Sequence, residues 1–236
     1  MSQTTIPIHD VSRDDESSIP FKLIPLELKT EYDSSVPHRH NYYEIFVFEK
    51  EGGHHDIDFD RYSIENYGIH YVSPGQVHNV ERGLGTFGWV ILFSRDFVEI
   101  GGGSGKLFEL PFLNNSPNPV LNLNATEYDE LRGLIETMTV ESQGEFQHAG
   151  EIIRSTLMVF LMKCHRFYCE RFPQDDQVYK SSTFKEFRKL LEQHFASKHK
   201  VKDYAELLNT TEKTLNESIK KMTGRTASEL IFDRLI

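Results

Sequence analysis

The 236-residue sequence has little of what places a protein in a membrane or cross-links it. Its longest apolar run, residues 157–162, is far too short to span a bilayer. Residues 1–20 contain acids and no apolar segment, so we interpret them as a flexible arm, neither a signal peptide nor an anchor. Cys164 and Cys169, the two cysteines, would face different sides of a helix, which argues against a disulfide. We therefore expect a cytoplasmic protein with reduced thiols and no membrane partner.

Positive charge is also scarce. The chain has 26 Lys and Arg against 36 Asp and Glu, a net charge of -10, which argues against a nucleic-acid surface over the whole protein. The charge is divided unevenly, however. Residues 181–236 hold 11 basic and 8 acidic side chains, a net of +3, whereas residues 1–180 hold 15 and 28, a net of -13. This asymmetry is expected when only the C-terminal end meets a polyanion.

The spacing within this C-terminal segment predicts a helix-turn-helix. Residues 201–208 have the period of a short amphipathic helix, and residues 209–211 form a polar turn in which Thr210 or Thr211 can cap the next helix. A second apolar stripe follows, and Gly224 supplies a C-terminal cap. The residues expected to be buried are Tyr204, Leu207 and Leu208 in the first helix, and Leu215, Ile219 and Met222 in the second.

The opposite face of the second helix is polar, as base reading in a major groove requires. We expect Lys213 and Asn216 to be the base readers. Thr211, Lys220 and Lys221 are expected to contact phosphates. Glu217, on the same face, repels phosphate and could accept a hydrogen bond only from a cytosine amino group. The alternative is that this face is simply the solvated side of a small helical bundle.

The rest of the chain divides into strands and then helices. From residue 21 to about residue 94, short alternating segments separated by Gly, Pro and acidic turns predict a small antiparallel barrel or sandwich. From Asn124 the period becomes helical, with a capping box to Glu127 and helices expected over residues 125–141 and 149–171. The apolar stripe of the second helix is too wide for one neighbour, which favours burial by a partner subunit.

One strand predicts a cluster of imidazoles and a carboxylate. His38, His40 and Glu44 alternate onto one face together with Tyr42 and Phe46. His78, after a Pro-Gly turn, would enter from another strand, and Trp89 is placed in the same pocket. His38, His40, Glu44 and His78 could bind Zn, Fe or Mn, or they could bond one another around an organic ligand without metal. We expect no metal and no cofactor. His54, His55 and His70 fit no ligand set and are expected in loops or at the surface.

With both ends considered, the chain resembles transcriptional regulators of the AraC/XylS family over nearly its whole length. HRHNYYEI with PGQVH resembles their cupin signature, and YAELLNTTEKTLNESIKKMTGRTASELIFDRLI resembles the first half of their DNA-binding domain. The resemblance implies an α+β fold: a cupin-like antiparallel β-barrel, a two-helix dimerisation segment and a small all-α helix-turn-helix unit. The expected boundaries are an arm at 1–20, the barrel at 21–122, the dimerisation helices at 123–172, a linker at 173–180 and the helix-turn-helix unit at 181–236.

The implied function is that of a ligand-responsive, homodimeric, DNA-binding regulator without enzymatic activity. In the family a basic residue commonly stands where this chain has Glu217, so groove reading is expected to be altered. Only the first of the family's two helix-turn-helix units is recognisable, so we expect a fragment or truncated product that binds DNA poorly. The alternatives are a metal-dependent cupin enzyme, such as a dioxygenase or isomerase with a helical oligomerisation tail, and a module that acts by pairing with a complete relative.

Overall fold

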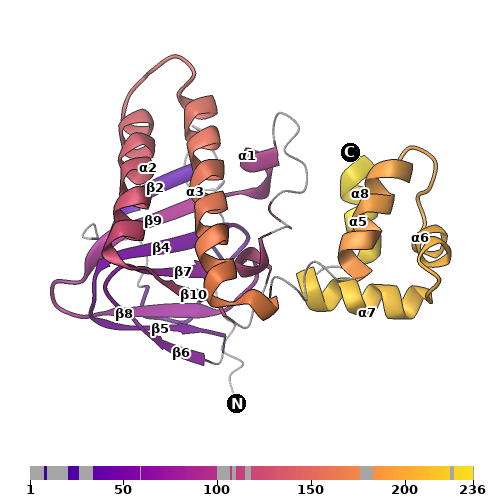
Figure 1. Cartoon of the computed structure of the whole chain (residues 1–236), viewed down its shortest axis with the longest axis horizontal. Helices are drawn as coiled ribbons and strands as arrows, with labels where there is room; N and C mark the ends of the chain where they lie inside the picture. The colour runs from indigo at the N-terminus through magenta and orange to yellow at the C-terminus, as the bar shows by residue number, and fades with distance from the viewer. Residues whose placement is uncertain are drawn as a thin grey trace.

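The computed structural model describes residues 8–9, 21–26, 34–58, 60–99, 107, 110–114, 118–175, 183–223 and 226–235. Antiparallel sheets come first and helices follow, so the chain is a mixed α+β protein as expected (Figure 1). The strands are β1 (Ile8–His9), β2 (Phe21–Pro25), β3 (Arg39–His40), β4 (Tyr43–Lys50), β5 (Gly53–Ile57), β6 (Asp60–Ser63), β7 (Gly68–Val72), β8 (His78–Arg82), β9 (Phe87–Phe93) and β10 (Val120–Asn122). Helix α1 (Arg95–Glu99) and the 3-10 turn η2 (Pro111–Leu113) lie between β9 and β10.

Two antiparallel sheets form the N-terminal part. The larger has the strand order β10-β7-β4-β9-β2 and the smaller the order β6-β5-β8. Among the described strands the ladders do not close into the expected barrel, although an isolated antiparallel bridge joins His38 to His78. The arm contributes β1, which pairs in parallel with β3.

The larger sheet is covered on both faces. Residues 43–48 of β4 are all buried, because one face packs against helices and the other against the smaller sheet (Figure 1). Tyr43, Ile45 and Val47 belong to the helix-covered core, while Phe46 and Phe48 belong to the core between the two sheets. The even-numbered residues of β4 therefore point into the sandwich, as alternation predicts.

Helices α2 (Ala125–Gln143) and α3 (Ala149–Arg171) cover the outer face of the larger sheet, close to the ranges predicted. The predicted capping box is present: Asn124 Oδ1 accepts from the Glu127 amide, and the Glu127 carboxylate accepts from the Asn124 amide. Tyr128 on α2 donates a 2.8 Å hydrogen bond to Glu49, so α2 is tied directly to the strand that carries Glu44. No helix in the described ranges combines the length and apolar character needed to cross a membrane.

The C-terminal helices α5 (Thr183–His194), α6 (Val201–Leu207), α7 (Glu212–Thr223) and α8 (Ala227–Leu235) have a hydrophobic core of their own. Tyr204, Leu215 and Ile219 are fully buried there, as predicted. Leu207 is exposed, which corrects one position of the expected stripe. Gly224 and the side chain of Met222 lie outside the described residues, as do residues 176–180 of the predicted linker.

The turn between α6 and α7 is built from the residues that the sequence singled out. Asn209 ends α6 in the left-handed conformation, at a φ of 51° that Asn tolerates better than most residues. Thr211 Oγ1 then accepts a hydrogen bond from the Thr214 amide, which caps the N-terminus of α7. The helix-turn-helix predicted from spacing is therefore confirmed as a local structure.

Candidate functional site

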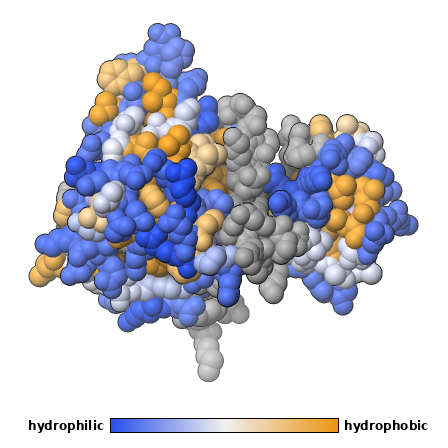
Figure 2. All heavy atoms as spheres, viewed as in Figure 1, coloured by the Kyte–Doolittle hydropathy of each residue, from blue (hydrophilic) through white to orange (hydrophobic). Residues whose placement is uncertain are grey.

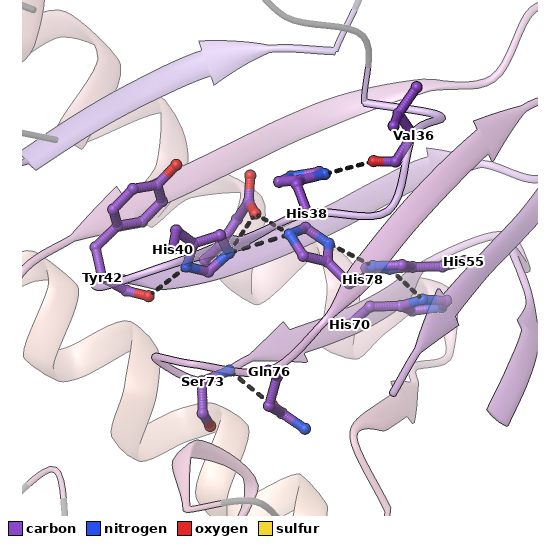
Figure 3. A network of polar contacts seen from close by, with 10 residues as sticks. Val36, His38, His40, Tyr42, His55, His70, Ser73, Gln76 and His78 are labelled. Atoms are coloured by element: carbon purple, nitrogen blue, oxygen red, sulfur yellow. Dashed lines mark hydrogen bonds and ion pairs between the residues drawn. The ribbon is translucent and has the colours of Figure 1, made fainter. Parts of the chain in front are cut away.

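Six ionisable side chains lie buried between the two sheets, each at most 3% exposed. They come from β3, β4, β5, β7 and β8 and from the residue before β3, and Figure 3 shows the five histidines among them converging inside the sandwich. The set is His38, His40, Glu44, His55, His70 and His78. Burial of so many polar side chains is costly unless they are mutually bonded or hold a ligand, so their convergence marks this interior as the candidate site.

The imidazoles form a continuous chain of contacts (Figure 3). His40 Nδ1 donates to the carbonyl of Tyr42 at 2.7 Å, and His40 Nε2 lies 3.1 Å from His78 Nε2. His78 Nδ1 lies 3.1 Å from His55 Nε2, and His55 Nδ1 lies 3.2 Å from His70 Nδ1. Glu44 Oε2 lies 3.0 Å from His40 Nε2 and 3.2 Å from His78 Nε2. The chain thus runs from the Glu44 carboxylate on β4 to His55 on β5 and His70 on β7.

Burial sets the charge state of the far end of this chain. Burial, reinforced by the neighbouring His70, holds the pKa of His55 well below its usual range. Burial also lowers the pKa of His70 to about 3. Both rings are therefore neutral at physiological pH, and each can offer one donor and one acceptor nitrogen.

Aromatic rings form the apolar wall of the site. The ring of Tyr42 stacks on His40 with centroids 4.1 Å apart, and Phe46 meets His55 edge-on at 4.8 Å. Phe48 contacts His70 in the same edge-on manner. Polar groups that converge between aromatic walls are typical of a small-ligand or metal site.

The structure brings together most of the residues predicted for the pocket, namely His38, His40, Tyr42, Glu44, Phe46 and His78. The placement of Trp89 was wrong: it lies on the face of β9 that packs against the helices, with Ile91 and Phe93. Val90 and Leu92 face the interior instead, because alternate residues of a strand point to opposite faces.

His55 and His70 were predicted in loops or at the surface, and this was also wrong. His54 is the partly exposed member of its pair, with Asp56 and Glu81 nearby, whereas His55 points inward. One signal could have found His55: it shares its strand face with the apolar Ile57, while His54 shares the other face with Asp56. His70 carried no such signal, because every residue of β7 is buried.

The second candidate surface is the exposed side of α7. Lys213, Glu217 and Lys220 are exposed there, with Lys213 Nζ 3.9 Å from Glu217 Oε1. The side chain of Lys221 lies outside the described residues. Asn216 has a structural role that the spacing did not predict: its Oδ1 accepts a 3.0 Å hydrogen bond from the Ala227 amide, at the N-terminus of α8. Its amide nitrogen remains a candidate contact to a base.

Comparison with known proteins gives distant structural likenesses. No protein-family model matches the chain, and no curated protein is significantly similar to it in sequence. ToxT from Vibrio cholerae aligns with 90% of this chain and 98% of its own, at 10% identity and a TM-score of 0.36. ToxT from Vibrio cholerae O395 bound to (E)-4-(8-methylnaphthalen-1-yl)but-3-enoic acid aligns at 11% identity and a TM-score of 0.36, covering 92% of this chain and 100% of its own.

The AraC-like transcriptional activator CuxR aligns with 83% of this chain and 66% of its own, at 12% identity and a TM-score of 0.35. Structural likeness at this level of identity and TM-score assigns no function to this chain.

Proposed function

We propose that this chain is a DNA-binding transcription regulator whose sandwich interior binds a small effector and whose α2 and α3 helices form a homodimer. The observation that carries the proposal is the local structure of α6 and α7. Helix α7 buries Leu215 and Ile219 against the other C-terminal helices and turns Lys213, Glu217 and Lys220 to solvent. A capped helix with a polar exposed face after a tight turn is the arrangement that enters a major groove.

The roles of the exposed residues follow from their chemistry. Lys213 would read a base edge, assisted by the Asn216 amide nitrogen, and Glu217 would accept from a cytosine amino group. Lys220, Lys221 and Thr211 would contact phosphates. The segment carries a net charge of only +3, so we expect binding that is weak and strongly dependent on salt.

Fluorescence anisotropy with labelled duplex DNA tests this assignment. For Lys220→Ala, the plot of log affinity against log salt should become shallower by about 0.9, the amount expected when one phosphate contact is lost. For Lys213→Ala, discrimination at one base pair should fall by about 1–3 kcal/mol. Lys50→Ala, an exposed lysine on β4, removes the same charge from the sandwich and should change neither quantity. Equal effects of all three substitutions would show that α7 is not the contact surface.

The proposed dimer surface lies on the outer side of the helix pair. Large apolar side chains stand exposed there: Val140 on α2, Phe146 in the connection, and Ile152, Val159 and Met162 on α3. Figure 2 shows hydrophobic side chains gathered over this part of the molecule. Val159 and Met162 lie on the side of α3 opposite the stripe that packs on the sheet, so a second copy of the same surface is the occupant that we infer.

Val159→Asp should convert the dimer to a monomer in sedimentation velocity experiments, because the new carboxylate would be buried without a partner in the interface. Ser63→Asp adds the same charge on the exposed strand β6 and should leave the dimer intact. A wild-type chain that sediments as a monomer at tens of micromolar would contradict this part of the proposal.

A further inference from the structure

Three ligand atoms converge inside the sandwich with mutual distances of 3.0–3.2 Å. They are His40 Nε2, His78 Nε2 and Glu44 Oε2. Among the described groups, Glu44 Oε2 is buried without a hydrogen-bond partner although both nitrogens are close to it, so neither ring aims an N–H at this oxygen. The carboxylate oxygen thus approaches both nitrogens closely without a hydrogen bond to either, as the ligand atoms of one metal ion would.

The neutral rings of His38 and His40 each use their one N–H in a hydrogen bond to a backbone carbonyl. His38 Nδ1 bonds the carbonyl of Val36 at 2.9 Å, and His40 Nδ1 bonds the carbonyl of Tyr42 at 2.7 Å. A carbonyl oxygen can only accept, so both Nδ1 atoms donate and each neutral ring carries its lone pair on Nε2. The lone pair of His40 Nε2 then faces the anionic Glu44 oxygen at 3.0 Å, an acceptor against an acceptor. A bound cation removes this conflict.

We propose that His55 and His70 act as positioning residues: they set the tautomer and orientation of His78 for a divalent transition-metal ion that His40 Nε2, Glu44 Oε2 and His78 Nε2 would hold. The ligand atom of His38 also lies within 4.8 Å of those of Glu44 and His78. Imidazole nitrogens with one carboxylate oxygen suit first-row ions such as Zn²⁺ and Fe²⁺. Taking this ion to be the effector rests on the proposed function; the metal site itself does not.

The role of His55 and His70 follows from the direction of the hydrogen bonds. Without metal, His40 Nε2 accepts, so His78 must donate from Nε2 and accept at Nδ1. His55 then donates from Nε2, and His70 donates from Nδ1 to His55 Nδ1. These tautomers are assigned from the bonding pattern.

Metal binding reverses the direction of the hydrogen bonds between these imidazoles. A metal on His78 Nε2 moves the His78 proton to Nδ1, which then donates to His55 Nε2 and moves the His55 proton to Nδ1. His55 therefore acts as the acceptor that fixes the orientation and tautomer of a ligating histidine, which is the usual task of a group bonded to a metal-bound imidazole.

The test is calorimetric titration of the chelator-treated full chain with ZnCl₂ at neutral pH, without DNA. We expect one Zn²⁺ per chain, and Glu44→Gln should abolish this binding. His55→Ala should weaken the affinity about 10- to 100-fold, as loss of such a supporting contact typically does. His54→Ala, its neighbour on the outer face of the same strand, is the matched control and should bind Zn²⁺ like the wild type.

Nitrogen-15 NMR of the histidine rings in the wild-type chain gives a readout that does not depend on how the variants fold. On addition of Zn²⁺, His78 and His55 should change from the Nε2-protonated to the Nδ1-protonated tautomer. Absence of stoichiometric Zn²⁺ binding, or binding without these tautomer changes, would overturn the proposal. Zn²⁺ binding that leaves DNA affinity unchanged would instead refute only the effector role, whereas DNA binding without Zn²⁺ binding would refute only the metal site.

Discussion

Replacement of His70 by asparagine should make the sandwich markedly less sensitive to acid. In the folded chain, burial lowers the pKa of His70 to about 3, whereas the unfolded chain titrates near the ordinary histidine value of about 6.5. Below about pH 6.5 the unfolded state therefore binds one proton more than the folded state. Because of His70, the free energy of unfolding therefore decreases by about 1.4 kcal/mol per pH unit as the pH falls from about 6.5 toward about 3.

Between pH 6 and pH 4 the wild type should thus lose about 2–3 kcal/mol more stability than His70→Asn. Asparagine can retain a polar contact to His55 but cannot take up a proton in this range. Urea unfolding is followed by the fluorescence of Trp89, the single tryptophan, which packs against the core that the larger sheet shares with α2 and α3. Parallel stability curves for the wild type and His70→Asn would show that His70 is not buried in its neutral form.

Gly88→Ala should prevent the sandwich from folding normally, at a cost of about 4 kcal/mol or more. Gly88 lies on β9 opposite Phe48, at a φ of 151°, and a Cβ atom at this position would stand 2.0 Å from the carbonyl oxygen of Val47. The obstacle is backbone, so it cannot move aside without separating β4 from β9. Because β4 carries Glu44, the site would be lost together with the sheet pairing.

Gly133→Ala on α2 provides the opposite control. A Cβ there meets nothing within 4 Å, so alanine should stabilise the helix by about 0.5–1 kcal/mol. Both variants are compared with the wild type in soluble yield and in urea midpoint. A Gly88→Ala chain with the wild-type midpoint would mean that β9 does not approach β4 as described.

The helices and the inward face of β4 were predictable from sequence because their signals are local. The Asn124 capping box and the stripe from Tyr128 to Met138 define α2, and simple alternation placed Tyr42, Glu44 and Phe46 on one face. These patterns depend on neighbours a few residues apart, which the sequence displays directly.

The positions of His55 and His70 in the site depend on the register between strands, which the sequence does not display. Ile57 pairs with His78, and this pairing brings the neighbouring His55 toward the larger sheet. Strands β7 and β9 are buried on both faces, so apolar residues fill both sides and alternation cannot tell the inward face from the outward one. His70 was missed and Trp89 misplaced for this single reason.

Hydrogen bonds also connect the strands of the site to the helices that cover the larger sheet. Strand β4 carries Glu44 into the interior, and Glu49 near its end accepts the hydrogen bond from Tyr128 on α2. Tyr168 on α3 and Asn118 beside β10 both donate hydrogen bonds to Asp175, which lies close to the start of the C-terminal helices in sequence. A ligand that moves β4 or β7 would therefore act on groups that hold the helix pair, provided that it binds the two arrangements with different affinity.

The most direct test of DNA reading by α7 is selection from a pool of random-sequence duplexes with the purified chain at low salt, followed by sequencing. The account predicts that the wild type enriches one short motif, that Lys213→Ala changes or loses the preference at one position of it, and that Lys50→Ala enriches the same motif as the wild type. Enrichment of no motif, or an identical motif for Lys213→Ala, would contradict the account.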